Sequence, residues 1–133
     1  MKELWPAGMS LPVAEYVPGL AVSLGEAVSL VSFSGQVSMT AKGLVGDGSI
    51  EQQTEQVFDN IEAVLALGGA GLDDLVSMTI YLTDRAHFSG FNAVRDGRLM
   101  VAGARTTSAV VIVAGLVDPR HLVEISGFAL VTA

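Results

Sequence analysis

Two charged side chains in the second half of the sequence have types and positions that could do chemistry. Arg105 is expected to open a strand whose continuation, at 109–113, is wholly apolar. A guanidinium there is costly unless it meets an anion, and its rigid fork suits a carboxylate. Glu124 lies within the run 122–126, where a strand is expected and an unpaired carboxylate is equally unfavourable. Taken alone, the two are interpreted more simply as an ion pair across adjacent strands, or as residues on a solvated sheet face.

The other residue types that often carry catalysis form no motif. The chain has no cysteine, which excludes disulfides, thiolate catalysis and cysteine-held metals. His87 and His121 lie far apart in the sequence and are interpreted as solvated histidines of a turn or a helix start, so no metal is expected. Ser34 has no histidine at a useful spacing, and the glycines lack the spacing of a dinucleotide fingerprint. Serine–histidine catalysis and nucleotide binding are therefore disfavoured.

The elements that must position Arg105 and Glu124 follow from the hydrophobic pattern. Ser49 stands three residues before Gln52, a capping-box spacing that favours a helix start. Residues 75–83 alternate between apolar and polar side chains, which is typical of a strand. The predicted elements are a β-hairpin at 22–33, a helix from Ser49 to the glycines at 68–71, a strand at 75–83, a second helix after Asp84, and strands at 104–116 and 122–131.

This order, β-β-α-β-α-β-β, predicts a single α+β domain over residues 1–133. A mixed sheet with both helices packed on one face is the economical arrangement. Half of the residues are hydrophobic and only 16% are charged, against about 25% charged in typical domains. Nothing else in the sequence is long enough to cover the second sheet face, so we expect sheets of several copies to pack face to face.

Composition also excludes several classes of protein. The longest apolar run, at 109–117, is far shorter than the ~20 residues that a membrane-spanning helix needs. The N-terminus lacks the pattern of a secretory signal, so a cytoplasmic location is expected. The formal net charge of −7 repels phosphate backbones and makes nucleic acid a disfavoured partner.

An ordered series of short motifs resembles the RidA/YjgF family, also called the L-PSP endoribonuclease family. The motifs are Glu-Tyr-Val at 15–17, Phe-Ser-Gly-Gln at 33–36, Glu-Gln-Val-Phe-Asp-Asn-Ile at 55–61, Leu-Asp-Asp-Leu-Val at 72–76, Thr-Ile-Tyr-Leu-Thr-Asp at 79–84, Phe-Asn at 91–92, Ala-Arg-Thr at 104–106 and Val-Glu-Ile at 123–125. The resemblance implies a chorismate-mutase-like α+β fold and a homotrimer with sites in the clefts between subunits. It also implies enamine/imine deaminase activity that requires no metal or cofactor.

The resemblance further assigns roles to individual residues. Arg105 matches the arginine that grips the substrate carboxylate, and Glu124 matches the acidic residue that positions the attacking water. The residues that match the lining of the cleft are Tyr16, Ser34, Gly35 and Asn92, and Thr107 falls where many members have cysteine. Two departures, Gly103 in place of a proline and Arg95 in place of an aromatic residue, imply a more flexible arginine loop and a different cleft shape.

Three functions follow as hypotheses. The leading one is hydrolytic deamination of 2-imino or enamine acids, such as 2-aminoacrylate, 2-iminopropanoate or 2-iminobutanoate, to 2-keto acids and ammonia. The second is a family member that binds a carboxylated metabolite at Arg105 without turnover. The third, an endoribonuclease, follows from the family's alternative name and is disfavoured by the acidic charge.

Overall fold

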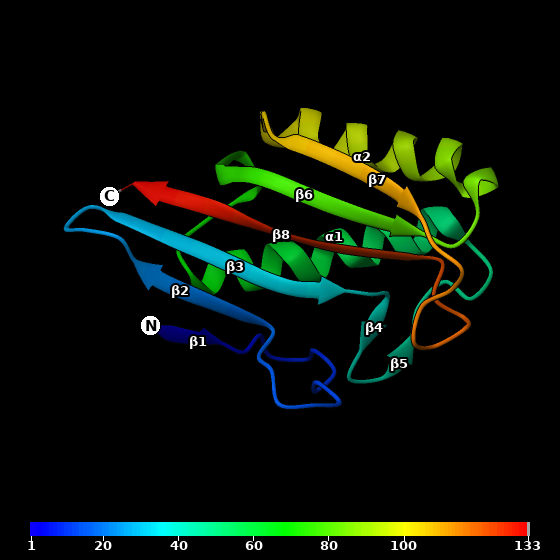
Figure 1. Cartoon of the computed structure of the whole chain (residues 1–133), viewed down its shortest axis with the longest axis horizontal. Helices are drawn as coiled ribbons and strands as arrows, with labels where there is room; N and C mark the ends of the chain where they lie inside the picture. The colour runs from blue at the N-terminus through cyan, green and yellow to red at the C-terminus, as the bar shows by residue number, and fades with distance from the viewer. Residues whose placement is uncertain (133) are drawn as a thin grey trace.

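The computed structural model describes residues 1–132, and in them a twisted sheet lies in front of the long helix α1 (Figure 1). The elements are β1 (Lys2–Leu4), β2 (Gly19–Ser23), β3 (Val28–Gln36), β4 (Met39–Thr40), β5 (Gly43–Leu44), α1 (Ile50–Leu67), β6 (Leu75–Leu82), α2 (Phe88–Ala102), β7 (Thr107–Ile112) and β8 (Val123–Thr132), with short 3-10 turns at Leu72–Asp74 and Arg85–His87. The predicted order of two strands, helix, strand, helix and two strands is confirmed. The short strands β1, β4 and β5 were not predicted.

The sheet is mixed, as predicted. Its strand order is β1-β2-β3-β8-β6-β7, and β4 and β5 form a separate two-stranded ribbon. Only the pair β6–β7 of the six-stranded sheet is parallel, because α2 forms the crossover between these two strands. The C-terminal strand β8 is therefore central, and β7 lies at an edge.

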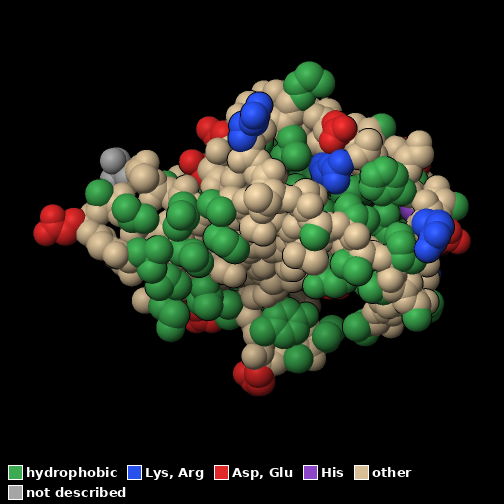
Figure 2. Space-filling view, turned by 45° about the horizontal axis from the view of Figure 1, so that its top comes forward, with side chains coloured by type: hydrophobic (Ala, Val, Ile, Leu, Met, Phe, Trp, Pro, Cys, Tyr) green, Lys and Arg blue, Asp and Glu red, His purple; other side chains and the backbone are tan. Residues whose placement is uncertain are grey.

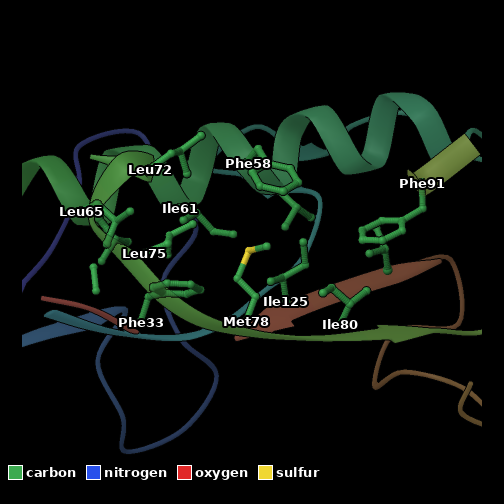
Figure 3. Packing of buried hydrophobic residues seen from close by; sticks show 14 of the residues in the cluster. Phe33, Phe58, Ile61, Leu65, Leu72, Leu75, Met78, Ile80, Phe91 and Ile125 are labelled. Carbon is green, nitrogen blue, oxygen red and sulfur yellow. The ribbon is translucent and has the colours of Figure 1, made fainter. Parts of the chain in front are cut away.

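Both helices pack on one face of this sheet, and the core lies between them and the strands. Figure 3 shows Phe58, Ile61 and Leu65 of α1 pointing toward Phe33, Met78 and Ile125 of the sheet. The fully buried hydrophobic side chains of α1 recur at helical spacing, and they are Val57, Phe58, Ile61, Val64 and Leu65. From α2 only Phe91 is buried, so this helix covers the sheet less deeply.

The predicted helix starts are confirmed, with one difference. Ser49 caps α1, because its hydroxyl oxygen accepts a hydrogen bond from the Gln52 amide at 3.2 Å. Asp84 accepts a hydrogen bond from the Ala86 amide at 2.8 Å, but it caps the 3-10 turn that precedes α2. The α-helix itself begins at Phe88.

The strand predicted at 104–116 is shorter in the structure, where β7 spans Thr107–Ile112. Gly103 ends α2 in the left-handed conformation, at a φ of 68°, and Ala104 donates a hydrogen bond back to Leu99. These contacts hold residues 104–106 as a connection, so Arg105 precedes the strand instead of opening it.

The second sheet face is left open, as the sequence predicts. Its left end in Figure 2, where β2, β3 and β8 meet, carries many hydrophobic side chains. Leu130 there is 37% exposed, and Val111 on the edge strand β7 is 44% exposed. The single chain therefore leaves apolar surface that a second copy could bury. No helix within residues 1–132 is long and apolar enough to cross a membrane.

Candidate functional site

Glu124 lies on the open face, near the start of β8. It pairs in register with Tyr81 of β6, and its neighbours Val123 and Ile125 are fully buried on the helix side. Strand alternation therefore places the Glu124 side chain away from the core. Its position on a strand confirms the strand assignment made from the sequence.

A β-bulge in the neighbouring strand β3 faces Glu124. Phe33 pairs with Gly127, and Gln36 pairs with Ile125. Two residues of β3, Ser34 and Gly35, therefore lie opposite a single residue of β8, which defines a β-bulge. The Gln36 side chain donates a hydrogen bond to the Ser34 carbonyl at 3.1 Å and braces the bulge. The bulge turns the backbone of β3 toward the carboxylate.

Gly35 allows the close approach between this bulge and Glu124. A Cβ atom at position 35 would lie 2.6 Å from Glu124 Oε2 and 2.8 Å from Cδ, so a larger residue would displace the carboxylate. Burial raises the pKa of the Glu124 carboxyl group. A carboxylate that water solvates poorly is a better proton acceptor than an exposed one, provided that it remains ionised.

The Glu124 carboxylate borders a cavity of about 270 Å³. Tyr16, Ser34 and Gly35, three of the predicted cleft residues, line the same cavity. Ser34 holds the segment before β2 in place, because its amide donates to the Pro18 carbonyl at 2.8 Å and its hydroxyl donates to the Val17 carbonyl. This segment carries Tyr16, which is 49% exposed at the cavity.

The cavity continues past the end of β3 toward α1, where Asn60 and His121 line it. His121 is only 5% exposed, so the interpretation of this residue as a solvated histidine is wrong. The reason is tertiary: Gln53 of α1 accepts a hydrogen bond from the Leu122 amide at 2.8 Å and donates to the Arg120 carbonyl at 2.9 Å. These bonds draw the turn before β8 against the helix and bury the imidazole.

Arg105 lies elsewhere in the chain, in a second hollow that Thr107 and the end of α2 also line. Thr107 of β7 pairs with Ser77 of β6, and Glu124 of β8 pairs with Tyr81 of β6. Ser77 and Tyr81 are four residues apart on the same strand. At ~3.3 Å per residue and ~4.8 Å between strands, Thr107 is ~13 Å along the strands and ~10 Å across the sheet from Glu124. Arg105 is exposed and precedes Thr107. The ion pair between Arg105 and Glu124 across adjacent strands is therefore wrong, because β6 separates β7 from β8.

Asn92 lies on α2 and does not line the cavity at Glu124. Its side-chain oxygen accepts a hydrogen bond from Arg95, which also reaches Ser108 of β7 at 3.3 Å. The Arg95 guanidinium stacks 5.2 Å from the centre of the Phe91 ring. Asn92 is thus tied to the edge strand that follows Arg105, on the opposite side of the sheet from Glu124.

The connection before Arg105 has a geometry that proline cannot adopt. Gly103 has a positive φ, and its amide donates to the carbonyls of Leu99 and Met100. Proline has a fixed negative φ and no amide hydrogen. A proline at position 103 would therefore require another backbone path at this helix end. Among residues 1–132 no three histidine, aspartate or glutamate side chains gather as metal ligands would.

The mixed sheet with its two helices places the chain structurally in the YjgF/L-PSP class of folds. Residues 9–131 match the family model described as Endoribonuclease L-PSP. The chain therefore belongs to this family, and the resemblance noted in its motifs is confirmed.

Similar proteins include two from Saccharomyces cerevisiae and one from an archaeon. The chain is 36% identical to Protein HMF1 over 85 residues, which are 62% of this chain and 66% of that protein. It is 35% identical to the mitochondrial Protein MMF1 over 80 residues, 58% of this chain and 55% of that protein. It is 32% identical to a RutC family protein of Pyrococcus abyssi over 84 residues, 62% of each. The matches thus span between 55% and 66% of the length of these relatives.

Solved structures are similar over nearly the whole chain. Yeast Mmf1 superposes with a TM-score of 0.85 at 25% identity, covering 99% of this chain and 98% of that one. The YjgF gene product of E. coli gives 0.82 at 25% identity, with 97% and 98% covered. RidA from the Antarctic bacterium Psychrobacter gives 0.81 at 28% identity, with the same coverage.

Sequence reasoning missed His121, which lines the cavity, and Gln53, whose hydrogen bonds hold the turn of His121 against α1. Gln53 lies four residues before Val57 on the buried stripe of α1, and a polar residue at such a position could have marked a buried hydrogen-bond network. His121 gave no such signal, because its burial depends on the contact of its turn with α1.

Proposed function

We propose that this protein hydrolyses reactive 2-imino acids and their enamine tautomers to 2-keto acids and ammonia, at sites formed between the subunits of a homotrimer. The observation that carries the proposal is the half-buried Glu124 carboxylate, held against the Gly35 backbone at the border of a cavity. Membership of a family that includes a protein named RidA supports the assignment. A cytoplasmic location stays a prediction.

Glu124 is assigned to the attacking water. The water adds to the C=N carbon of the protonated imine, and one of its protons passes to the carboxylate, so that the iminium becomes a neutral carbinolamine with a C–O bond in place of the C=N π bond. Glu124 then returns that proton to the nitrogen. The C–N bond breaks and ammonia leaves, while the hydroxyl group loses its proton to the Glu124 carboxylate and becomes the carbonyl of the 2-keto acid. The raised pKa of Glu124 suits both steps, because the same group must accept and release a proton.

Arg105 is assigned to the substrate carboxylate, which its planar fork can hold with two hydrogen bonds. The distance between Arg105 and Glu124 within one chain is too large for both to touch a small imino acid. One chain therefore carries two incomplete half-sites, the hollow at Arg105 and the cavity at Glu124. A complete site forms when the hollow at Arg105 of one subunit faces the cavity at Glu124 of the next subunit. The edge strand β7 exposes apolar residues such as Val111 and Ile112, so burying this edge against another subunit is favourable.

In this arrangement the remaining predicted residues divide between the two subunits. Tyr16, Ser34 and Gly35 accompany Glu124. Thr107 accompanies Arg105, and its hydroxyl already donates to the Val76 carbonyl at 3.0 Å, so Thr107 is assigned to shape rather than to proton transfer. Asn92, through Arg95 and Ser108, supports the start of β7.

A trapping assay tests the activity. An amino-acid oxidase generates the imine, semicarbazide captures whatever survives, and active protein lowers the amount captured. We expect Arg105→Ala and Glu124→Gln each to lose at least ~10²-fold in rate. Unchanged trapping with the purified parent protein would contradict the proposal.

Mixing the two inactive variants tests the shared site. When Arg105→Ala and Glu124→Gln chains are unfolded, mixed and refolded together, some interfaces combine an intact Arg105 with an intact Glu124. Activity should return in the mixture and stay absent in each variant refolded alone. A mixture as inactive as its components, although mixed oligomers are present by mass spectrometry, would show that both residues must come from one chain.

The second candidate is a protein that binds a carboxylated metabolite without turnover. It predicts equilibrium binding of a 2-keto acid that Arg105→Ala abolishes, together with no imine hydrolysis. The retained and half-buried Glu124 disfavours it. An endoribonuclease is disfavoured by the net charge of −7, and the absence of RNA retention at low salt would exclude it.

A further inference from the structure

The cavity at Glu124 is bordered by a second carboxylate, that of Asp118 in the turn before β8. Arg120 holds this carboxylate in place. Its Nη2 lies 2.7 Å from Asp118 Oδ2, and its Nε and backbone amide donate to Oδ1 at 3.1 and 2.9 Å. These hydrogen bonds keep the pKa of the Asp118 carboxyl group well below its usual range. Asp118 is therefore ionised at any pH near neutrality.

The cation of this ion pair does not border the cavity. Asp118 lines the cavity wall, whereas Arg120 lies outside the lining. The Arg120 side chain is 56% exposed and that of Asp118 is 29% exposed, so water screens the guanidinium more strongly than the carboxylate. The ion pair thus presents its negative end to the cavity.

The charges that line the two half-sites leave no partner for a second substrate carboxylate. Within residues 1–132 the lining of both half-sites includes one lysine or arginine, Arg105, and two carboxylates, Asp118 and Glu124. Arg105 is assigned to the carboxylate that every 2-imino acid carries. A further carboxylate on the side chain would leave water without a cation to meet, and it would be repelled by both acidic residues.

The rest of the cavity lining suits an uncharged side chain. Apolar residues of the lining include Met9, Leu11, Val13, Val37 and Val117. Leu11 and Val117 are 78% and 97% exposed, and an aliphatic group that contacts them removes apolar surface from water.

We propose that Asp118 is a specificity-determining residue, which together with Glu124 excludes 2-imino acids that carry a second carboxylate. The favoured substrates are monocarboxylic imino acids with uncharged side chains, ahead of dicarboxylic ones of the same shape. This inference rests on the proposed imine hydrolysis, and it adds the substrate class.

Leucine and aspartate supply a matched pair of imines for the test. Their side chains have the same branched shape, since the two methyl groups of leucine take the places of the two carboxylate oxygens of aspartate. Amino-acid oxidases convert each amino acid into its imine, and semicarbazide trapping gives kcat/KM, which is divided by the rate of uncatalysed hydrolysis. The charge ratio is the resulting value for the aspartate imine divided by that for the leucine imine. We expect a charge ratio of roughly 0.1 or less for the parent protein, equivalent to ~1.4 kcal/mol.

Two substitutions break the same ion pair but change the charge in opposite directions. Asp118→Asn removes a carboxylate from the cavity and leaves the Arg120 guanidinium unopposed, so the charge ratio should rise about tenfold. Arg120→Gln leaves the Asp118 carboxylate unopposed, so the charge ratio should stay at the parent value or fall. Asp59→Asn is the matched control, because Asp59 also pairs with an arginine, Arg98, at 3.0 Å and lies outside both half-sites. It makes the same change in net charge as Asp118→Asn and should leave the charge ratio unchanged.

The possible failures are distinguishable. The inference is overturned, and the proposed function stands, if Asp118→Asn keeps the parent's charge ratio. The same holds if Arg120→Gln or Asp59→Asn raises the charge ratio as much, since the cause is then a loosened turn or the net charge. A parent protein that hydrolyses the imine of alanine but neither of the matched pair also overturns the inference alone, because an apolar side chain is then refused as well. If the parent hydrolyses none of the three imines, the proposed function is overturned and the inference falls with it. Cooperative thermal unfolding of each variant shows that a changed charge ratio comes from a folded protein.

Discussion

Replacing Gly35 with alanine should disable the site without unfolding the protein. The new Cβ atom would lie 2.6 Å from Glu124 Oε2, whereas ordinary contacts begin at 3.4 Å. The carboxylate must therefore retreat by roughly 0.8 Å, and a misplacement of about 1 Å in a catalytic group can lower the rate ~10²-fold. The cost to folding is small, because Gly35 has no positive φ and the displaced atoms belong to the end of a flexible side chain.

The semicarbazide assay and thermal unfolding together check this prediction. We expect Gly35→Ala to lose ~10²-fold in kcat/KM while its Tm changes by only a few degrees. Gly25→Ala is the matched control, since Gly25 lies in the turn between β2 and β3 and a Cβ atom there meets nothing within 4 Å. A Gly35→Ala protein that is as active as the Gly25→Ala protein would refute the argument that close packing at Gly35 positions Glu124.

Three further predictions concern stability. Gly103→Pro should lower the free energy of unfolding by ~3 kcal/mol or more, because proline can neither adopt the positive φ nor donate a hydrogen bond to Leu99 and Met100. Urea unfolding measures this loss. A decrease of less than about 1 kcal/mol would contradict the helix-end geometry. Gln53→Leu should lower the free energy of unfolding by about 1–3 kcal/mol, because the Leu122 amide and the Arg120 carbonyl lose their hydrogen-bond partner. Faster hydrogen exchange of the Leu122 amide would locate the effect at this contact. Glu124→Gln should raise Tm at pH 7, because burial raises the pKa of Glu124 in the folded state and so penalises its charged form. The folded state then binds the proton more tightly than the unfolded state, and the difference in Tm should disappear below pH 4.5; a gap that persists there would refute this cause.

Local patterns sufficed for most of the fold. The alternation at 75–83 predicted β6, and the Ser49 cap with the apolar stripe after it predicted α1. The pattern failed where a tertiary contact decided the outcome. β1 was missed because its three residues are too few for a periodic signal, and Leu4 is buried only once β1 pairs with β2.

The candidate site divides in the same way. The sequence by itself determined that Arg105 and Glu124 stand out, since charged side chains beside apolar strand segments are unusual in any fold. It could not determine their separation, because strand order depends on which hydrophobic faces pack together. Because β6 lies between β7 and β8, Arg105 and Glu124 do not form the ion pair across adjacent strands, and they line different hollows.

Sequence alone thus determined the two helices, the five longer strands, the family and the uncovered sheet face, because periodicity and short motifs are local properties of the chain. Only the tertiary structure decided that a bulge presses Gly35 against Glu124 and that Gln53 draws the turn at His121 beneath α1. Both outcomes depend on contacts between residues far apart in the sequence. The burial of Glu124 and His121, which perturbs the pKa of each, follows from those contacts and not from the neighbours of either residue in the chain.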